Sequence, residues 1–272
     1  MLKTEMRNPK TMHINEAETL DMVSIMQEEN KNAAAAIDSQ LPSIAKAVDS
    51  ISERMARGGR LFYIGCGTSG RLGVLDASEC PPTFGVPKSL VVGIIAGGDY
   101  ALRNAIEGAE DNAELGREDL LAHNITELDS VIGISVAGGA RYVIGALESA
   151  KELGALTVAI TSNEGAPIEK IADIGIHPDT GAEVITGSTR LKAGTAHKMI
   201  LNMISTGVMV KLGHVYENLM INLRPANVKL EARMVRIVSD ILKIGEAPAK
   251  RLLDENDFVI KKALLAAGKE VK

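Results

Sequence analysis

Short runs rich in valine and isoleucine recur through the middle of the chain, and they constrain the fold more than any other feature. Most of them end in a glycine-rich or polar loop, and helical stretches separate them. Buried parallel strands that alternate with helices produce this pattern. We therefore expect an α/β fold, a three-layer, doubly wound and mostly parallel five-stranded sheet of the flavodoxin-like kind. The expected strands are 61–64, 90–96, 131–135, 156–160 and 174–176.

Helices are expected on both sides of this sheet region. Between Leu41 and Met55, apolar residues recur at steps of three and four, which is one face of a helix. Pro42 suits the first turn of that helix. We expect an N-terminal arm with helices over 1–57, the sheet domain over 58–225 and a C-terminal helical region over 226–272. After the sheet strands, a long apolar helix is expected over about 191–212.

Composition excludes several classes of function. Aromatic residues make up 3% of the chain and tryptophan is absent, so stacking of bases on an aromatic platform is not expected. The net charge of −5 disfavours binding to nucleic acid or to an anionic membrane. Cys66 and Cys80 have no zinc-site spacing, so we expect no metal. No apolar run approaches a membrane span, and a cytoplasmic protein is expected.

The stretch FYIGCGTSGRLGVLDASECPPTFG, residues 62–85, has the glycine spacing of a dinucleotide-binding turn. That interpretation requires an uninterrupted helix after the glycines and an acidic residue about 20 positions on. We expect Pro81-Pro82 to cut the helix short, and Asp99 lies too far along the chain. A turn with Thr68 and Ser69 at a helix start favours an anion or sugar hydroxyls instead. From this segment alone, a purely structural turn is the alternative.

A second polar cluster occupies GAEVITGSTRLKAGTAHK, residues 181–198. It combines hydroxyl and cationic side chains at the expected start of the long apolar helix, which suits an anionic ligand. Helix capping is the structural alternative for the hydroxyl groups. His197 taken alone is more typical of a structural histidine than of a catalyst. The residues that we single out are Ser188, Thr189, Arg190, Lys192 and Thr195.

Two glutamates stand in unusual settings for surface charge. Glu79 follows the first helix and precedes Cys-Pro-Pro, and Glu110 lies in a helical stretch rich in glycine and alanine. Most glutamates are solvated surface groups, and spacing alone does not distinguish these two. Paired carboxylates in different environments can nevertheless divide the roles of acid and base.

These segments together resemble a known family, the N-acetylmuramic acid 6-phosphate etherases, which have the sugar isomerase (SIS) fold. The resemblance covers about residues 4–238, and the related animal glucokinase regulators share part of it. The motifs that carry it are TEMRNPKT, GCGTSGRLGVLDASECPPTFG, AIEGAED, GAEVITGSTRLKAGTAHKMILNMISTG and LMINLRPANVKLEARMVRIV.

The resemblance implies a cytoplasmic, homodimeric carbon–oxygen lyase of cell-wall recycling. Such an enzyme converts N-acetylmuramate 6-phosphate and water to N-acetylglucosamine 6-phosphate and D-lactate, without a metal or an organic cofactor. The family's acid falls on Glu79 and its base on Glu110. The residues expected to bind the sugar phosphate are Gly67, Thr68, Ser69, Ser135, Gly138, Ser188, Thr189, Arg190, Lys192 and Thr195.

The loop after the third strand departs from the family, which has Ser-Gly-Arg-Thr-Pro-Tyr where this chain has Ala137–Tyr142. Three side chains that could bind phosphate are lost, and Arg141 is gained. The C-terminal helical region is also shorter than the family's. A non-catalytic sugar-phosphate sensor therefore stays open as an alternative, as does an aldose–ketose isomerase on the same fold. Retention of both glutamates favours the etherase.

Overall fold

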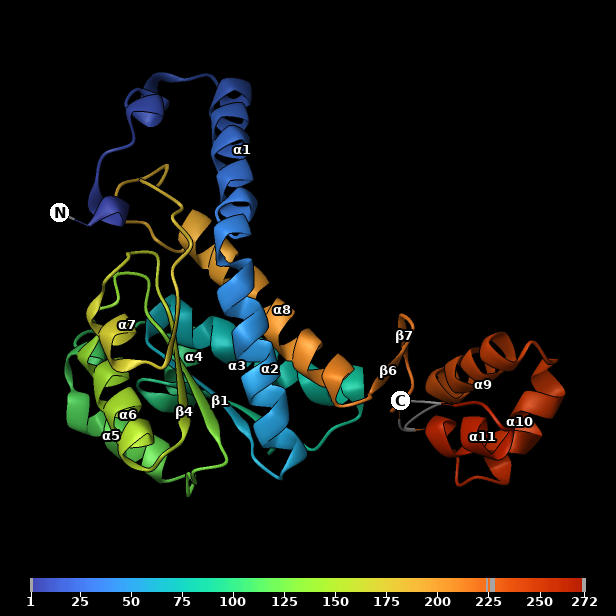
Figure 1. Ribbon diagram of the computed structural model, residues 1–272. Helices are drawn as coiled ribbons and strands as arrows, with labels where there is room; N and C mark the ends of the chain where they lie inside the picture. The colour runs from blue at the N-terminus through green and yellow to red at the C-terminus, as the bar shows by residue number, and fades with distance from the viewer. Residues whose placement is uncertain (1, 224, 226–227, 271–272) are drawn as a thin grey trace.

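A five-stranded parallel sheet forms the centre of the protein, as the valine- and isoleucine-rich runs predict (Figure 1). The computed structural model describes residues 2–223, 225 and 228–270. The strands lie in the order β2-β1-β3-β4-β5, and all four pairings are parallel. They are β1 (Leu61–Gly65), β2 (Val91–Ile95), β3 (Ser130–Ile134), β4 (Leu156–Ile160) and β5 (Ile174–Ile176).

The order of the strands fixes where a ligand can bind. From β1 the chain moves to β2 on one side, and it then returns to β3 on the other side of β1. In open α/β sheets, ligands bind beyond the carboxyl ends of the strands at the point where the order reverses. This switch point lies between the loops that follow β1 and β3.

Helices cover both faces of the sheet, which completes the predicted three layers (Figure 1). Residues of α2, α3 and α8 share one apolar cluster with the sheet, and residues of α5, α6 and α7 share the other. The short helix α4 (Gly98–Arg103) follows β2. The covering helices are α2 (Leu41–Ala56), α3 (Gly67–Phe84), α8 (Lys192–Lys211), α5 (Ala113–Leu121), α6 (Arg141–Glu152) and α7 (Pro167–Ile171).

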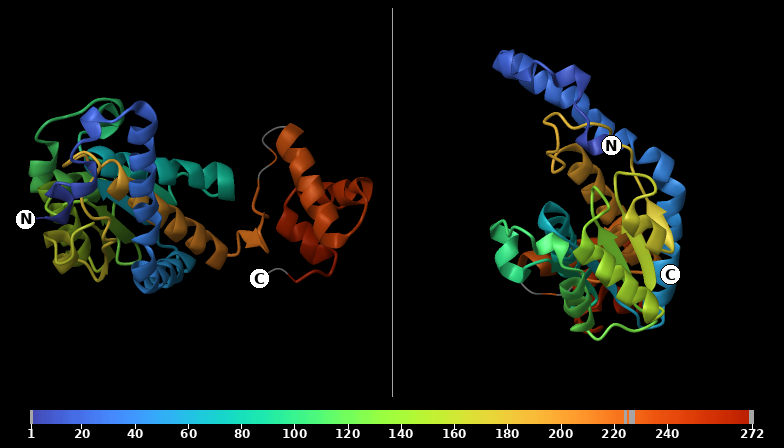
Figure 2. Two further views of the ribbon diagram at one scale, coloured as in Figure 1. Left: turned by 90° about the horizontal axis from the view of Figure 1, so that it is seen from above. Right: turned by 90° about the vertical axis from the view of Figure 1, so that its left-hand side faces the viewer.

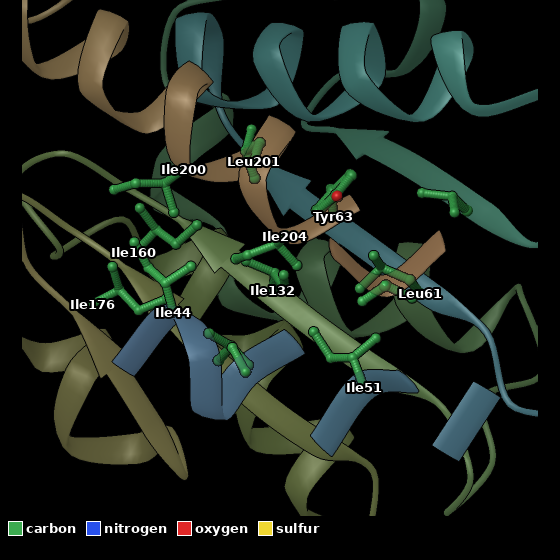
Figure 3. Packing of buried hydrophobic residues seen from close by; sticks show 14 of the residues in the cluster. Ile44, Ile51, Leu61, Tyr63, Ile132, Ile160, Ile176, Ile200, Leu201 and Ile204 are labelled. Atoms are coloured by element: carbon green, nitrogen blue, oxygen red, sulfur yellow. The ribbon is translucent and has the colours of Figure 1, made fainter. Parts of the chain in front are cut away.

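The two apolar clusters explain why the strands are apolar at nearly every position. Leu61 and Tyr63 point into the α2–α3–α8 cluster, whereas Phe62 and Ile64 point to the other side. Figure 3 shows Ile132 and Ile160 of the sheet packed with Ile204 and other side chains of the helices. Each fully buried side chain of this size contributes about 1.5–3 kcal/mol.

Helix α3 runs through Pro81 and Pro82, so the expectation that they cut it short is wrong. Each proline lacks the N–H that would bond to the carbonyl four residues earlier, so two helical bonds are lost, but burial of Cys80 and Phe84 in the core holds this turn in place. The helix ends at Gly85, which has φ 66° and donates its N–H to the Pro81 carbonyl. Glu79 therefore lies inside the helix and not after it.

The N-terminal arm folds back over the loops at the carboxyl ends of the strands (Figure 1). Asn8 donates to the carbonyl of Ala182, and the Thr11 hydroxyl donates to that of Val184. The arm continues into α1 (Thr19–Ala35), which packs against α8. The 3₁₀ turns are η1 (Lys3–Glu5), η2 (Pro9–Thr11), η3 (Ile14–Glu16), η4 (Asp38–Gln40) and η5 (Ala109–Asp111).

The C-terminal part of the chain is a separate helical unit with its own apolar cluster. It stands away from the sheet beyond the end of α8 (Figures 1 and 2). The sequence did not predict its short hairpin. The elements, together the C-terminal unit, are β6 (Val215–Tyr216), β7 (Leu219–Met220), α9 (Val228–Leu242), α10 (Glu246–Asp254) and α11 (Ile260–Ala266). The predicted start at 226 falls outside the described residues.

Candidate active site

The loop after β1 opens the candidate site. Gly67 has φ 51° and begins α3, and Ser69 is buried within the first turn. No side chain caps this helix start among the residues that the structure describes. Gly70 approaches the backbone so closely that a Cβ there would lie 2.5 Å from the Gly65 oxygen. The glycines thus allow a tight turn, and the first N–H groups of α3 stay available to an anion or a hydroxyl group.

A cavity of about 370 Å³ lies in front of this turn. Its wall combines Cys66, Gly67 and Arg71 with the chain from Asn104 to Glu110. Glu110 is exposed in the turn η5, whereas the sequence predicted a helix there. The structure thus brings Glu110 to the helix start that Gly67, Thr68 and Ser69 form.

The thiol of Cys66 lies in the wall of this cavity. Burial, followed by the nearby carboxylates of Glu110 and Asp111, raises the pKa of Cys66 to about 12. The thiol is therefore protonated at neutral pH. Because the thiolate is the nucleophilic form, Cys66 is not suited to attack a substrate.

Arg71 positions the segment that carries Glu110. Its guanidinium donates to the carbonyl oxygens of Ala101 (2.7 Å), Leu102 (2.9 Å) and Asn104 (3.2 Å). This role of Arg71 could not be predicted from the sequence. Its three acceptors are backbone carbonyls 30 to 33 positions away, and backbone groups leave no pattern of residue types.

The loop after β3 is held in shape by its own backbone and by Ser135. The Gly138 N–H donates to the Ser135 hydroxyl at 3.1 Å, and Gly138 has φ 73°. The Thr161 hydroxyl donates to the Val136 carbonyl at 3.0 Å. Ser135 thus stabilises the loop, and its expected contact with substrate stays a prediction. Arg141 begins α6 and is exposed, and its side chain has no ion pair within the described residues.

We expect Gly138→Ala to destabilise the protein by about 1–3 kcal/mol. A Cβ at Gly138 would lie 2.3 Å from the Ala166 Cβ, and the residue has positive φ. Gly139→Ala is the matched control, because its Cβ would meet nothing within 4 Å. Urea unfolding of both variants measures the difference. Equal stability of the two would contradict this account of the loop.

Lys192, at the start of α8, was expected to bind the sugar phosphate, but its side chain is not accessible to a ligand. This side chain is buried, and its Nζ lies 2.5 Å from Glu29 Oε2. Asn8 also donates to Glu29, and Lys10 lies 3.3 Å from it. Despite the opposing effect of burial, these partners lower the pKa of Glu29. Lys192 therefore ties α8 to α1 in this structure, and it is not open to a ligand.

A buried carboxylate already occupies the start of α8. Glu183 accepts the N–H groups of Lys192 and Ala193, each at 3.0 Å. The Thr195 hydroxyl donates to the Leu191 carbonyl at 2.7 Å. The first N–H groups of α8 are therefore bound by Glu183 and not by a hydroxyl group, as the structural alternative had it.

Part of the predicted polar cluster remains near the first turn of α3. A Cβ at Gly194 would lie 3.7 Å from Thr68 Cγ2, so the two helix starts are neighbours. Ser188 and Thr189 are half-buried and Arg190 is exposed. Within the described part of the chain, the side chains of these three residues make no hydrogen bond. They stay free to contact a ligand.

His197 is fully buried below the loops. Its Nε2 lies 3.0 Å from the Ser162 hydroxyl, and burial lowers its pKa to about 4. The neutral ring therefore cannot supply charge to a substrate at neutral pH. This geometry fits the structural role that the sequence favoured.

Glu79 lies away from the cavity that Glu110 lines. It is exposed on α3, twelve residues after Gly67, which corresponds to about 18 Å along the helix. Burial, followed by the carboxylates of Asp76 and Glu79, raises the pKa of neighbouring Cys80 to about 12. Within one chain, the structure does not bring the two predicted catalytic carboxylates together.

Curated proteins named N-acetylmuramic acid 6-phosphate etherase match nearly the whole chain. One from Caldanaerobacter subterraneus subsp. tengcongensis is 56% identical over 264 residues, 97% of this chain and 86% of the relative. Another from Cronobacter sakazakii is 51% identical over 97% of this chain and 89% of the relative. The chain belongs to the N-acetylmuramic acid 6-phosphate etherase family.

Family models and solved structures agree with this membership of the etherase family. The "glucokinase regulatory protein N-terminal SIS domain" matches residues 43–151, and the "SIS domain" matches 110–207. A phosphoheptose isomerase from Francisella tularensis has a TM-score of 0.51 at 17% identity, covering 71% of this chain and 98% of its own. A Bacteroides fragilis protein described as a phosphosugar isomerase has a TM-score of 0.54 at 22% identity, covering 72% and 94%. These structures establish the SIS fold.

The described residues of this etherase-family chain include neither a membrane-spanning helix nor a cluster of metal ligands. No helix of the described residues is long and apolar enough to cross a membrane. In the same part of the chain, no group of three or more His, Cys, Asp or Glu residues is arranged to hold a metal ion.

Proposed function

We propose that the protein cleaves the lactyl ether of N-acetylmuramate 6-phosphate, giving N-acetylglucosamine 6-phosphate and D-lactate. The observation that carries this proposal is the position of Glu110, which lines a cavity beside the uncapped start of α3. Identity of 51–56% to proteins of this name supports it. The two free cysteines suit a reducing compartment, so we place the reaction in the cytoplasm.

The chemistry needs a base and an acid. In the open-chain sugar, the proton on carbon 2 is α to the aldehyde, and Glu110 removes it. The resulting enolate develops negative charge on the carbonyl oxygen, which N–H donors such as those at the start of α3 can stabilise. The bond between carbon 3 and the lactyl oxygen then breaks, and Glu79 protonates the departing D-lactate. Water adds a hydroxyl to carbon 3 and a proton to carbon 2.

Glu79 reaches this cavity from a second copy of the chain. It shares one face of α3 with Leu75, which is 48% exposed. Helix α8 packs beside α3 and exposes Met203 (38%) and Val210 (49%). A self-complementary apolar face of this kind suits a two-fold dimer. In that dimer, each site combines Glu110 of one chain with Glu79 of the other.

The loop after β3 supports a second candidate, a sugar-phosphate sensor without activity. All residues of this loop are described in the structure. Ala137, Gly139 and Ala140 offer only backbone donors, and Arg141 is the one cation of the loop. One assay separates the two functions. The purified protein is given N-acetylmuramate 6-phosphate, D-lactate is measured enzymatically, and binding is measured by calorimetry. Release of D-lactate establishes the etherase, whereas binding without release would leave the sensor.

We expect the triple variant Ala137→Ser, Gly139→Arg, Ala140→Thr to lower KM for the sugar phosphate about tenfold or more, because each charge-assisted hydrogen bond contributes about 1.5–3 kcal/mol. Gly139 has open space for the larger side chain. The value of kcat should change little, since this binding is equal in ground and transition states. Gly139→Ala is the control. An unchanged KM would show that phosphate is bound elsewhere.

A further inference from the structure

Helix α1 presents an apolar surface that this chain leaves uncovered. Only Glu29 and Ala33 of its seventeen residues are buried, and all seventeen are described. Leu20 is 75% exposed and Val23 is 50% exposed. A helix in a folded protein normally packs its apolar side against another element. The N-terminal half of α1 projects beyond the start of α8 with no such neighbour in the described chain (Figures 1 and 2).

The same part of the chain is acidic. Residues 14–28, here called the acidic segment, contain no lysine or arginine. Glu16 faces His13, and Glu28 pairs with Lys31. Glu18 and Asp21 have no cationic partner within the described residues. Their neighbours Leu20 and Val23 thus lie in a field of negative charge.

Helix α9 has the complementary composition. Lys229, Arg233 and Arg236, here called the basic stripe, recur at steps of four and three and so share one face. None of the three is buried, and none pairs with a carboxylate in the part of the chain that the structure describes. An adjoining row of Val228, Ala232 and Val235 lines a groove of about 730 Å³.

This groove can receive a helix. Ala247 of α10 and Phe258 complete its apolar wall. Its charged lining residues are Glu231, Arg236, Glu246 and Lys250. Val228 is 82% exposed at one end. An amphipathic helix that docks in an apolar groove is a recurrent mode of recognition. The apolar wall of the groove matches Leu20 and Val23, and the basic stripe beside the groove matches the charge of the acidic segment.

The C-terminal unit cannot reach α1 of its own chain. Its hairpin begins four residues after α8 ends, and the Ile221 N–H donates to the His214 carbonyl. Ile221 and Leu223 are buried in the unit's own cluster. Helix α8 has 20 residues and is about 30 Å long. The C-terminal unit follows the last residue of α8, whereas α1 is anchored at the first residue of α8 through the Glu29–Lys192 ion pair.

A two-fold axis across the α3–α8 face brings the two elements together between chains. Where that axis is perpendicular to α8, the two copies of α8 run antiparallel. The end of α8 in one copy then lies beside the start of α8 in the other, where α1 is anchored. We propose that the C-terminal unit of each copy docks on α1 of a second copy, with the basic stripe against the acidic segment. This inference rests on the proposed dimer but not on etherase activity.

Cross-linking of co-expressed full-length chains tests the docking. One chain carries Val23→Cys and a larger affinity tag, and the other carries Ala232→Cys. A short bismaleimide is expected to give a covalent heterodimer only when both new cysteines are present. Leu153→Cys replaces Val23→Cys in the control, because Leu153 is 42% exposed at the opposite end of the sheet. The parent chain controls for Cys66 and Cys80.

Charge reversal adds a specific readout. Arg233→Glu with Arg236→Glu should lower the cross-linking yield at least about fivefold, because like charges then face each other. Glu18→Lys with Asp21→Lys in the other chain should restore it. Arg251→Glu on α10 is the control and should leave the yield unchanged.

The outcomes separate the inference from the proposed function. Sedimentation measures the dimer, and D-lactate release measures activity on the same samples. If the protein is a dimer but no cross-link forms between Val23→Cys of one chain and Ala232→Cys of the other, the docking is overturned and the α3–α8 interface is not. A further variant carries Val23→Cys and Ala232→Cys in the same chain. A cross-link that forms within this chain and not between chains would overturn the docking as well. A monomeric protein would overturn both the docking and the dimer, whatever its activity.

Discussion

Glu110→Gln is expected to lower kcat for D-lactate release by about two to four orders of magnitude, the usual contribution of a positioned base. An amide of nearly the same shape cannot take the proton from carbon 2. Glu110 is exposed in a 3₁₀ turn, so the exchange should leave folding intact. Steady-state kinetics with N-acetylmuramate 6-phosphate and calorimetric binding measure the two effects separately.

Glu107→Gln is the control for this substitution. Glu107 is exposed on the wall of the same cavity, so its exchange changes the local charge by the same amount. Activity close to that of the parent protein is expected. If both variants were equally impaired, the loss would reflect the charge of the cavity and not a base at Glu110.

Glu79→Gln is expected to cause a loss of similar size, about two to four orders of magnitude. Without a proton donor, the lactyl oxygen must leave as an alkoxide, which is a poor leaving group. Proton exchange at carbon 2, followed by mass spectrometry in heavy water, should persist because Glu110 is intact. Full D-lactate release by this variant would exclude Glu79 as the acid. Glu148→Gln, exposed on α6, is the control.

Local patterns in the sequence predicted the sheet well. Each strand is a compact, mostly apolar run with residues in one or both apolar clusters, so its signal does not depend on distant residues. The helix break at Pro81-Pro82 was predicted wrongly, because packing of Cys80 and Phe84 into the core, which the local sequence does not show, keeps the chain helical despite the two lost bonds. The two-residue strands β6 and β7 are too short to show a periodic pattern.

The candidate site was predictable only in part. Gly67 and Glu110 line one cavity, and their roles in binding and catalysis stay predictions. Lys192 shows the limit, because a lysine at a helix start has the same local pattern whether it is open or buried. Its burial depends on Glu29, 163 positions away in the sequence. The distance between Glu79 and the cavity follows from the twelve helical steps between Gly67 and Glu79, whereas the sequence interpretation placed Glu79 after the helix.

Complementation between two inactive variants tests the central claim most directly. In a dimer of one Glu79→Gln chain and one Glu110→Gln chain, a shared arrangement leaves one site with both carboxylates intact. Equal mixtures that exchange subunits at random should therefore recover about one quarter of the parent activity. Each variant alone should stay inactive. No recovery in verified mixed dimers would contradict a site built from Glu110 of one chain and Glu79 of the other.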